Sequence, residues 1–166
     1  MGGMIAPFLV AIAVTAQTAS LTFTKPPAWT DRAAGSSMRV AEFVVPRAPG
    51  DTEDAELIVY YFGGGGGSVD ANLQRWTSQF QSTKDPVRTT ATVNGLKLTS
   101  LDVSGTYVAE MRPGSAEHYN KPGYRMRATV VETPKGPYFI KLTGPAKTID
   151  SAGAAFEQFL HSLAFK

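Results

Sequence analysis

The chain has 166 residues, a length that suits one domain with its own hydrophobic core. Its formal net charge of +2 is too small to indicate a nucleic-acid-binding protein. The absence of cysteine excludes a disulfide framework, a thiol nucleophile and a lipid-modified cysteine. With two histidines and no cysteine, the sequence also offers no structural zinc site.

The N-terminal segment MGGMIAPFLVAIAVTA carries no charged side chain and is apolar through most of its length. It is too short to span a bilayer but is typical of a signal-peptide core, and small or short side chains precede a cleavage point near Gln17. We therefore expect residues 1–16 to be a signal peptide and residues 20–166 to form a single exported domain, periplasmic or extracellular, without a stable membrane anchor. A buried N-terminal helix is the alternative, which Pro7 disfavours.

The first half of the chain predicts three strands and a helix. SLTFT (20–24) and MRVAEFVV (38–45) each have the pattern of a strand, and ELIVYYF (56–62) is apolar on both parities, as in a central strand covered on both faces. Five consecutive glycines follow, and then Ser68 is a suitable N-cap for a helix. The apolar stripe of this helix comprises Val69, Leu73, Trp76 and Phe80.

Two hairpins are predicted in the second half. Asn94-Gly95 is a strong type I′ turn signal, because both residue types accept a positive φ; it joins strands over 87–93 and 96–110. A polar loop over 111–123 leads to the second hairpin, which joins strands over 124–132 and 138–142. If five residues close the second hairpin, one of its faces is basic. That face holds Arg125, Arg127, Thr129, Phe139 and Lys141.

An apolar stripe after Thr148, the expected cap, predicts a C-terminal helix. The elements then follow the order βββαββββα, with mostly hairpin-type links. We expect an α+β fold, with a mostly antiparallel sheet of about six to seven strands and helices packed on it.

The glycine-rich segments do not match a nucleotide-binding loop. GGGGGSVD lacks the lysine of a Walker loop, and Asp70 in the first helical turn would repel an anion. The element after this helix is a hairpin, so the segment does not belong to a dinucleotide-binding βαβ unit. LTGPAKT (142–148) lacks a glycine directly before its lysine, and Pro145 removes a backbone donor. We expect no nucleotide cofactor.

Neither histidine stands in a recognisable catalytic motif. His118 lies in the polar loop, and no serine stands in an elbow such as GxSxG. His161 follows Glu157 by one helical turn, which is typical of a solvent-facing pair. The acidic stretch 51–56 lacks the ligand spacing of a calcium loop. We expect no enzyme activity and no metal; a weak hydrolase using His118 is the catalytic alternative.

Four segments carry a resemblance to a known group of proteins: LTFTKPPAW, VYYFGGGGGSVDANLQRW, VNGLKLTSLDVSGTY and YRMRATVVETPKGPYFIKLTGPAKT. With them, the chain resembles uncharacterised exported bacterial proteins related to the PsbP-like, Mog-type α/β/α sandwich. The resemblance implies this sandwich fold and a role in binding other proteins, as in much of the wider fold. It implies no active-site residue, because the shared segments are fold and turn motifs.

These patterns leave two non-catalytic functions open. The leading hypothesis is an exported binding module that contacts a protein partner in the cell envelope. Its candidate binding surface comprises His118, Tyr119, Arg125, Arg127 and Lys141. The alternative is a carrier of a small ligand, with a pocket near Tyr61 and Trp76 between the central strand and the glycine-led helix.

Overall fold

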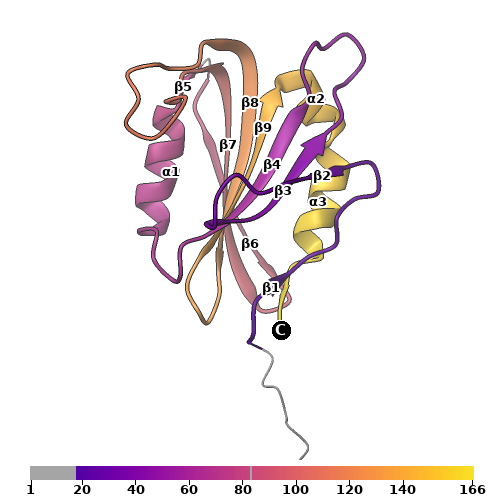
Figure 1. Cartoon of the computed structure of the whole chain (residues 1–166), viewed down its shortest axis with the longest axis vertical. Coiled ribbons are helices and arrows are strands. Elements are labelled where there is room, and N and C mark those ends of the chain that lie inside the picture. Colours follow the sequence, from indigo (N-terminus) through magenta and orange to yellow (C-terminus); the bar gives the residue numbers. More distant parts are fainter. Residues whose placement is uncertain (1–17, 83) are drawn as a thin grey trace, which may run out of the picture.

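The computed structural model describes residues 18–82 and 84–166 (Figure 1). The expected signal peptide, residues 1–16, lies outside the described residues. Across those described ranges, none of the helices combines the length and apolar character that a membrane crossing requires.

An antiparallel sheet of eight strands forms the centre of the domain, in the order β2-β3-β4-β9-β8-β7-β5 with β6 also paired to β7. Its strands are β2 (Thr30–Arg32), β3 (Arg39–Val45), β4 (Ala55–Tyr61), β5 (Phe80–Ser82), β6 (Val87–Val93), β7 (Leu96–Tyr107), β8 (Lys121–Glu132) and β9 (Tyr138–Pro145). A small second sheet pairs β1 (Leu21–Thr22) with β10 (Ala164–Phe165). The expected α+β class is confirmed, with more short strands than the sequence indicated.

Helices cover the two faces of the sheet, and Figure 1 shows them on opposite sides. The first helix, α1 (Val69–Ser78), packs on one face, and α2 (Ala146–Ser151) and α3 (Gly153–His161) pack on the other. The single C-terminal helix that we expected is therefore interrupted, at Ala152. Thr148 is a buried residue within α2 rather than its cap, and its hydroxyl accepts a hydrogen bond from the Ala48 N–H at 3.0 Å.

Each face has its own apolar core. On the α2–α3 face, Phe159 is fully buried among aromatic rings, with centroids 5.1 Å from Phe23 and 5.6 Å from Trp29. On the α1 face, Trp76 packs edge-on against Phe139 at 6.3 Å. The strand β4 lies in the middle of the sheet, as predicted, and Leu57 and Val59 are buried toward α2 and α3. On its other face only Ile58 is buried and Glu56 and Tyr60 are half-buried, so the predicted cover is complete on one face only.

The Asn94-Gly95 turn has the predicted conformation, with φ of 48° and 79°. The second hairpin differs from the prediction in its register. Val131 pairs with Tyr138, so the loop between them runs from 132 to 137 and is one residue longer than assumed. A shift of one residue moves every side chain of a strand to the opposite face. The predicted basic face therefore does not exist: Arg127 faces α3, and Lys141 faces the α1 side.

The glycine run, residues 63–67, joins β4 to α1 through backbone conformations that other residue types rarely adopt. Gly63, Gly64, Gly66 and Gly67 all have positive φ, and a Cβ on Gly66 would lie 2.6 Å from the Phe139 ring. The Ser68 side chain then accepts a hydrogen bond from the Ala71 N–H at 3.1 Å, which confirms the predicted N-cap. The run allows α1 to begin directly against the sheet.

Candidate functional site

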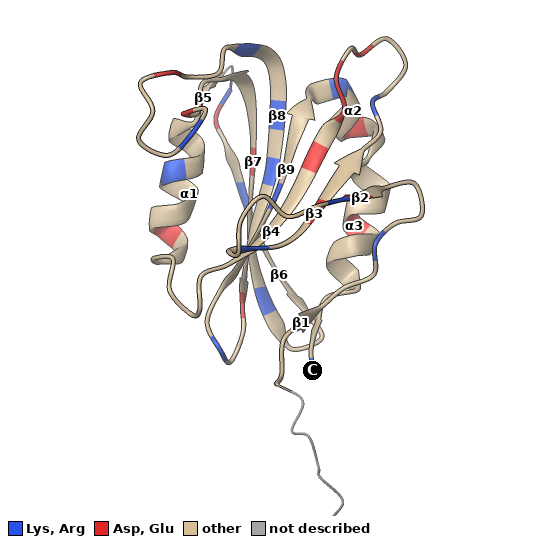
Figure 2. Cartoon of the chain, in the orientation of Figure 1, with Lys and Arg blue, Asp and Glu red and all other residues tan. Residues whose placement is uncertain are grey.

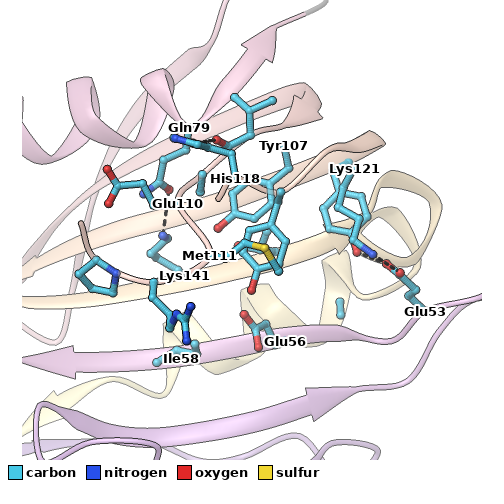
Figure 3. A pocket seen from close by; sticks show the side chains of 18 of the residues that line it. Glu53, Glu56, Ile58, Gln79, Tyr107, Glu110, Met111, His118, Lys121 and Lys141 are labelled. Carbon is cyan, nitrogen blue, oxygen red and sulfur yellow. Dashed lines mark hydrogen bonds and ion pairs between the residues drawn. The ribbon is translucent and has the colours of Figure 1, made fainter. Parts of the chain in front are cut away.

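A pocket of about 970 Å³ lies on the α1 face of the sheet (Figure 3). It exists because α1 packs against β5, β7 and β8, which leaves β4 and part of β9 without a helical cover on this face. Its walls are the C-terminal turn of α1 and the loop 108–120. Residues that alternate to this face form its floor: Val44, Glu56, Ile58, Tyr60, Lys141 and Thr143.

The loop 108–120 is shaped by its own hydrogen bonds. The Met111 N–H donates to the Glu117 carbonyl and the Tyr119 N–H to the Ala109 carbonyl, each at 2.9 Å. The predicted polar loop over 111–123 is thus displaced toward the N-terminus, since β8 already begins at Lys121. The loop presents His118 and Tyr119 to the pocket.

Three tyrosines form an aromatic wall. The Tyr107 ring stacks against Tyr119 at 5.4 Å and against Tyr124 at 6.0 Å between centroids. Burial raises the pKa of both Tyr107 and Tyr124. Tyr107 and Tyr124 therefore stay uncharged at neutral pH, and the wall offers ring surface to a ligand.

Most charges at the pocket are neutralised by neighbours. Lys121 and the Tyr124 hydroxyl both donate to the Glu53 carboxylate, and the hydrogen bond from Lys121 holds the pKa of Glu53 below its usual value. Arg32 donates to Glu56 at 2.5 Å and to the buried Glu42.

Glu42 also accepts from Arg39 and from the Gly35 N–H. Burial acts to raise the pKa of Glu42, and the hydrogen bonds from Arg39 and Gly35 outweigh it, so that this pKa is lowered. The Glu42 carboxylate therefore stays ionised and forms ion pairs with Arg32 and Arg39 at this side of the pocket.

Lys141 differs from these groups. Its amine donates to Gln79 Oε1 at 3.0 Å, the contact marked in Figure 3, and among the described residues it forms no ion pair. Burial, with the nearby positive charge of Arg75, lowers the pKa of Lys141 to about 8. Arg75 donates to Asn72 Oδ1 at 2.6 Å and likewise has no carboxylate partner within the described part of the chain.

A smaller cavity of about 160 Å³ adjoins these cations. It shares Tyr60, Arg75, Gln79 and Lys141 with the large pocket. The remaining lining is aromatic: Phe62, Trp76 and Phe139. Two cations thus lie where a polar pocket meets an apolar slot.

The structure brings together only part of the predicted binding surface. His118, Tyr119 and Lys141 line one pocket. Arg125 and Arg127 lie on the opposite face, where Arg125 pairs with Asp102 and Asp150, and Arg127 pairs with Glu157. Figure 2 shows the basic positions of β8 and the acidic positions of the covering helices.

Tyr61 and Trp76, expected to share a pocket, lie on opposite sides of the sheet. Tyr61 stacks on Tyr138 at 4.4 Å on the α2–α3 face, whereas Trp76 belongs to the α1 core. The preceding residue, Tyr60, is the one that lines the pocket with Trp76. The sequence interpretation also missed Arg75 and Gln79, although their spacing of four places them on one helix face.

Two features of the described residues concern metal binding and the surroundings of His118. No group of three or more His, Asp or Glu side chains within 18–82 and 84–166 is arranged to hold a metal ion. The His118 ring lies 2.9 Å from the Val108 carbonyl through Nδ1, and no serine or acid of the described chain is hydrogen-bonded to it. The pocket offers hydrogen-bond donors, aromatic surface and two cations.

No protein-family model matches this sequence, and no curated protein matches it. Among solved structures, the chain is similar to PA94, a protein of unknown function from Pseudomonas aeruginosa, with a TM-score of 0.50 and 16% identity over 87% of this chain and 96% of that one. It is also similar to CyanoP, a PsbP of Synechocystis sp. PCC 6803, with a TM-score of 0.49 and 13% identity over 97% and 100%. At these identities the likeness concerns the fold alone.

Proposed function

We propose that this protein is a non-catalytic binding module whose pocket receives a small organic anion, and that it works outside the cytoplasm as the segment 1–16 indicates. The observation that carries the proposal is Lys141, a cation in the pocket floor that no carboxylate of the described chain neutralises. A partly buried charge of this kind is costly unless a partner compensates it. A ligand carboxylate supplies such a partner.

The size and lining of the pocket support this proposal. A cavity of about 970 Å³ falls within the usual range for small-molecule sites. The stacked tyrosines provide flat surface for an organic framework, while Arg75 and Lys141 provide donors for an anionic group. Other pocket cations, such as Arg32 and Lys121, are already paired with carboxylates.

The earlier preference for a protein partner loses part of its support. Two of its five surface residues, Arg125 and Arg127, are engaged by carboxylates of β7, α2 and α3. The loop carrying His118 and Tyr119 remains available as the rim of the pocket. The small-ligand alternative therefore takes precedence, with its pocket moved from Tyr61 to the side of Tyr60.

Calorimetric titration tests the proposal, with succinate, citrate, benzoate and phenylacetate as probes. We expect at least one of these acids to bind, and binding to be lost in Lys141→Gln and weakened in Arg75→Gln. Lys97→Gln is the matched control, because Lys97 lies on β7 with an exposed side chain paired with Glu132 at 3.8 Å. The control should bind as the parent protein does.

Native mass spectrometry of protein purified from its own host provides the second measurement. A retained organic acid that is absent from Lys141→Gln supports the proposal. An apo mass together with no calorimetric signal for any of the four acids would overturn it.

A further inference from the structure

Lys141 stands apart from the other lysines of the described chain in what its amine touches. Lys121 pairs with Glu53 and Lys97 with Glu132, and Lys147 donates to the Pro49 carbonyl. The Lys141 amine instead contacts an uncharged amide, Gln79, at the junction of the large pocket and the aromatic slot. It is accessible from two cavities and held in place without being neutralised.

We propose that Lys141 is a covalent attachment site, at which its amine forms an imine with a small oxo acid, a molecule that carries both a carboxylate and an aldehyde or ketone group. The inference rests on the proposed function, since it places an organic anion in the same pocket. It adds the chemical class of the ligand and a bond to the protein.

Two cations at one junction suit the two groups of such a ligand. Arg75 lines the same slot as Lys141, and its guanidinium is held by Asn72 Oδ1 at 2.6 Å, which leaves further N–H groups to bind a carboxylate. Gln79 follows Arg75 by one turn and accepts from the Lys141 amine. The amine is therefore oriented beside the position that Arg75 provides for the carboxylate.

Formation of the imine requires neither an oxidant nor a reductant. The neutral amine attacks the carbonyl carbon, and the electron pair of the C=O π bond moves to oxygen, which takes up a proton as nitrogen releases one to water. The hydroxyl of the resulting carbinolamine takes up a proton and leaves as water while the nitrogen lone pair forms the C=N bond, and the nitrogen releases its remaining proton to solvent. One amine and one carbonyl group thus give one imine and one water.

The surroundings of the amine favour the neutral form that this step requires. Burial lowers the pKa of Lys141 to about 8 and Arg75 acts in the same direction, as does Arg39, while Glu56 opposes them. Glu110 and His118 of the loop also line the pocket. At neutral pH an appreciable fraction of Lys141 is uncharged, whereas an ordinary lysine is almost entirely protonated.

Reductive trapping tests the inference on the full chain. Incubation with glyoxylate and sodium cyanoborohydride, followed by peptide mass spectrometry, should place carboxymethyl groups on Lys141 at a rate about tenfold above that on Lys97 or more. Acetaldehyde, which has no carboxylate, is the matched probe. Arg75→Gln should slow labelling of Lys141 by both probes, because it removes a charge that lowers the pKa of Lys141. It should slow labelling by glyoxylate more than labelling by acetaldehyde, since only glyoxylate also loses a partner for its carboxylate, a difference that a loss of folding would not produce.

The outcomes separate this inference from the proposed function. Equal labelling of Lys141 and Lys97 by glyoxylate would overturn the imine, and the proposed function would still stand if a carboxylate without a carbonyl group bound in the calorimeter. Equal labelling combined with no calorimetric binding would overturn both. Preferential labelling that did not depend on Arg75 would contradict the assigned carboxylate position.

Discussion

On the face of the sheet covered by α2 and α3, the arginines of β8 meet carboxylates from the helices above them. Arg125 is held by Asp102 and Asp150, and Arg127 pairs with Glu157 while its guanidinium lies 4.8 Å from the Phe156 ring centroid. On the α1 face, Lys141 meets only an amide. The same sheet thus uses cations to attach helices on one side and leaves one cation exposed to a cavity on the other.

The positive charge of a strand residue therefore does not by itself show whether that residue lines the pocket. A basic residue in a strand acquires its role from the element that packs above it. Where a helix supplies a carboxylate, the cation serves stability; where no element covers the strand, it lines a pocket. Four substitutions test the contrast between the two faces, beginning with the largest expected effect.

Phe159→Ala should lower the free energy of unfolding by about 3–5 kcal/mol, because it leaves a cavity in the aromatic cluster of the α2–α3 face. Urea denaturation measures the loss. Met111→Ala, at the rim of the pocket with the side chain 45% exposed, should change stability by less than about 0.5 kcal/mol. Equal losses would show that the pocket side is as tightly packed as the covered face.

Gly66→Ala should destabilise the fold by about 2 kcal/mol, because φ is +109° and the new methyl group would lie 2.6 Å from the Phe139 ring. Gly65→Ala is the matched control, since its Cβ would meet nothing closer than the Phe62 carbonyl at 3.6 Å. Thermal unfolding of both variants distinguishes close packing of the glycine run from a merely flexible linker. Similar melting temperatures for the two would favour the flexible linker.

Arg125→Ala should lower stability by about 1–2 kcal/mol, because Arg125 donates to Asp102 through two nitrogens and also pairs with Asp150. Arg88→Ala removes a more exposed pair with Asp70 and should have almost no effect. A double-mutant cycle with Asp150→Ala measures the coupling between Arg125 and the carboxylate of α2. Absence of coupling would contradict the helix-attachment role given to Arg125.

Lys141→Met should raise stability at pH 7 by about 1 kcal/mol, because burial of the cation disfavours the folded state. The pKa of Lys141 is about 8 when folded and near 10.5 when unfolded, so the unfolded chain binds more protons between these values and the stability of the parent protein rises with pH there. The advantage of the variant should therefore shrink between pH 8 and pH 10. A constant advantage in denaturation measurements over this range would contradict the assigned pKa.

Local patterns predicted the elements well wherever neighbouring residues decide the structure. The Asn94-Gly95 turn, the Ser68 cap and the central position of the strand over 56–62 depend on positive φ, one hydrogen bond and a continuous run of apolar side chains. Each of these causes acts within a few residues, and each prediction is confirmed. The C-terminal helix was predicted as one element, and its interruption at Ala152 lies in a segment where the apolar stripe continues on both sides.

The placement of Lys141 in the candidate site depends on the length of the loop between β8 and β9, which is one residue longer than the sequence analysis assumed. With five residues between the strands, Lys141 would share a face with Arg125 and Arg127; with 132–137 between them, it faces the α1 side. The turn residues of TPKGP do not show this difference, because they do not specify which flanking residues pair; in the structure the Gly136 N–H donates to the Thr133 carbonyl at 3.0 Å.

By itself, the sequence determined the α+β class, the position of the main strands and the start of α1, because these follow from periodicity and turn chemistry within short windows. Only the tertiary structure decided which face each basic residue occupies and what lies above it. Register and helix placement depend on contacts between distant segments, such as Lys141 with Gln79 and Arg125 with Asp150. The pocket is a consequence of those long-range contacts, since it occupies the part of the sheet that α1 does not cover.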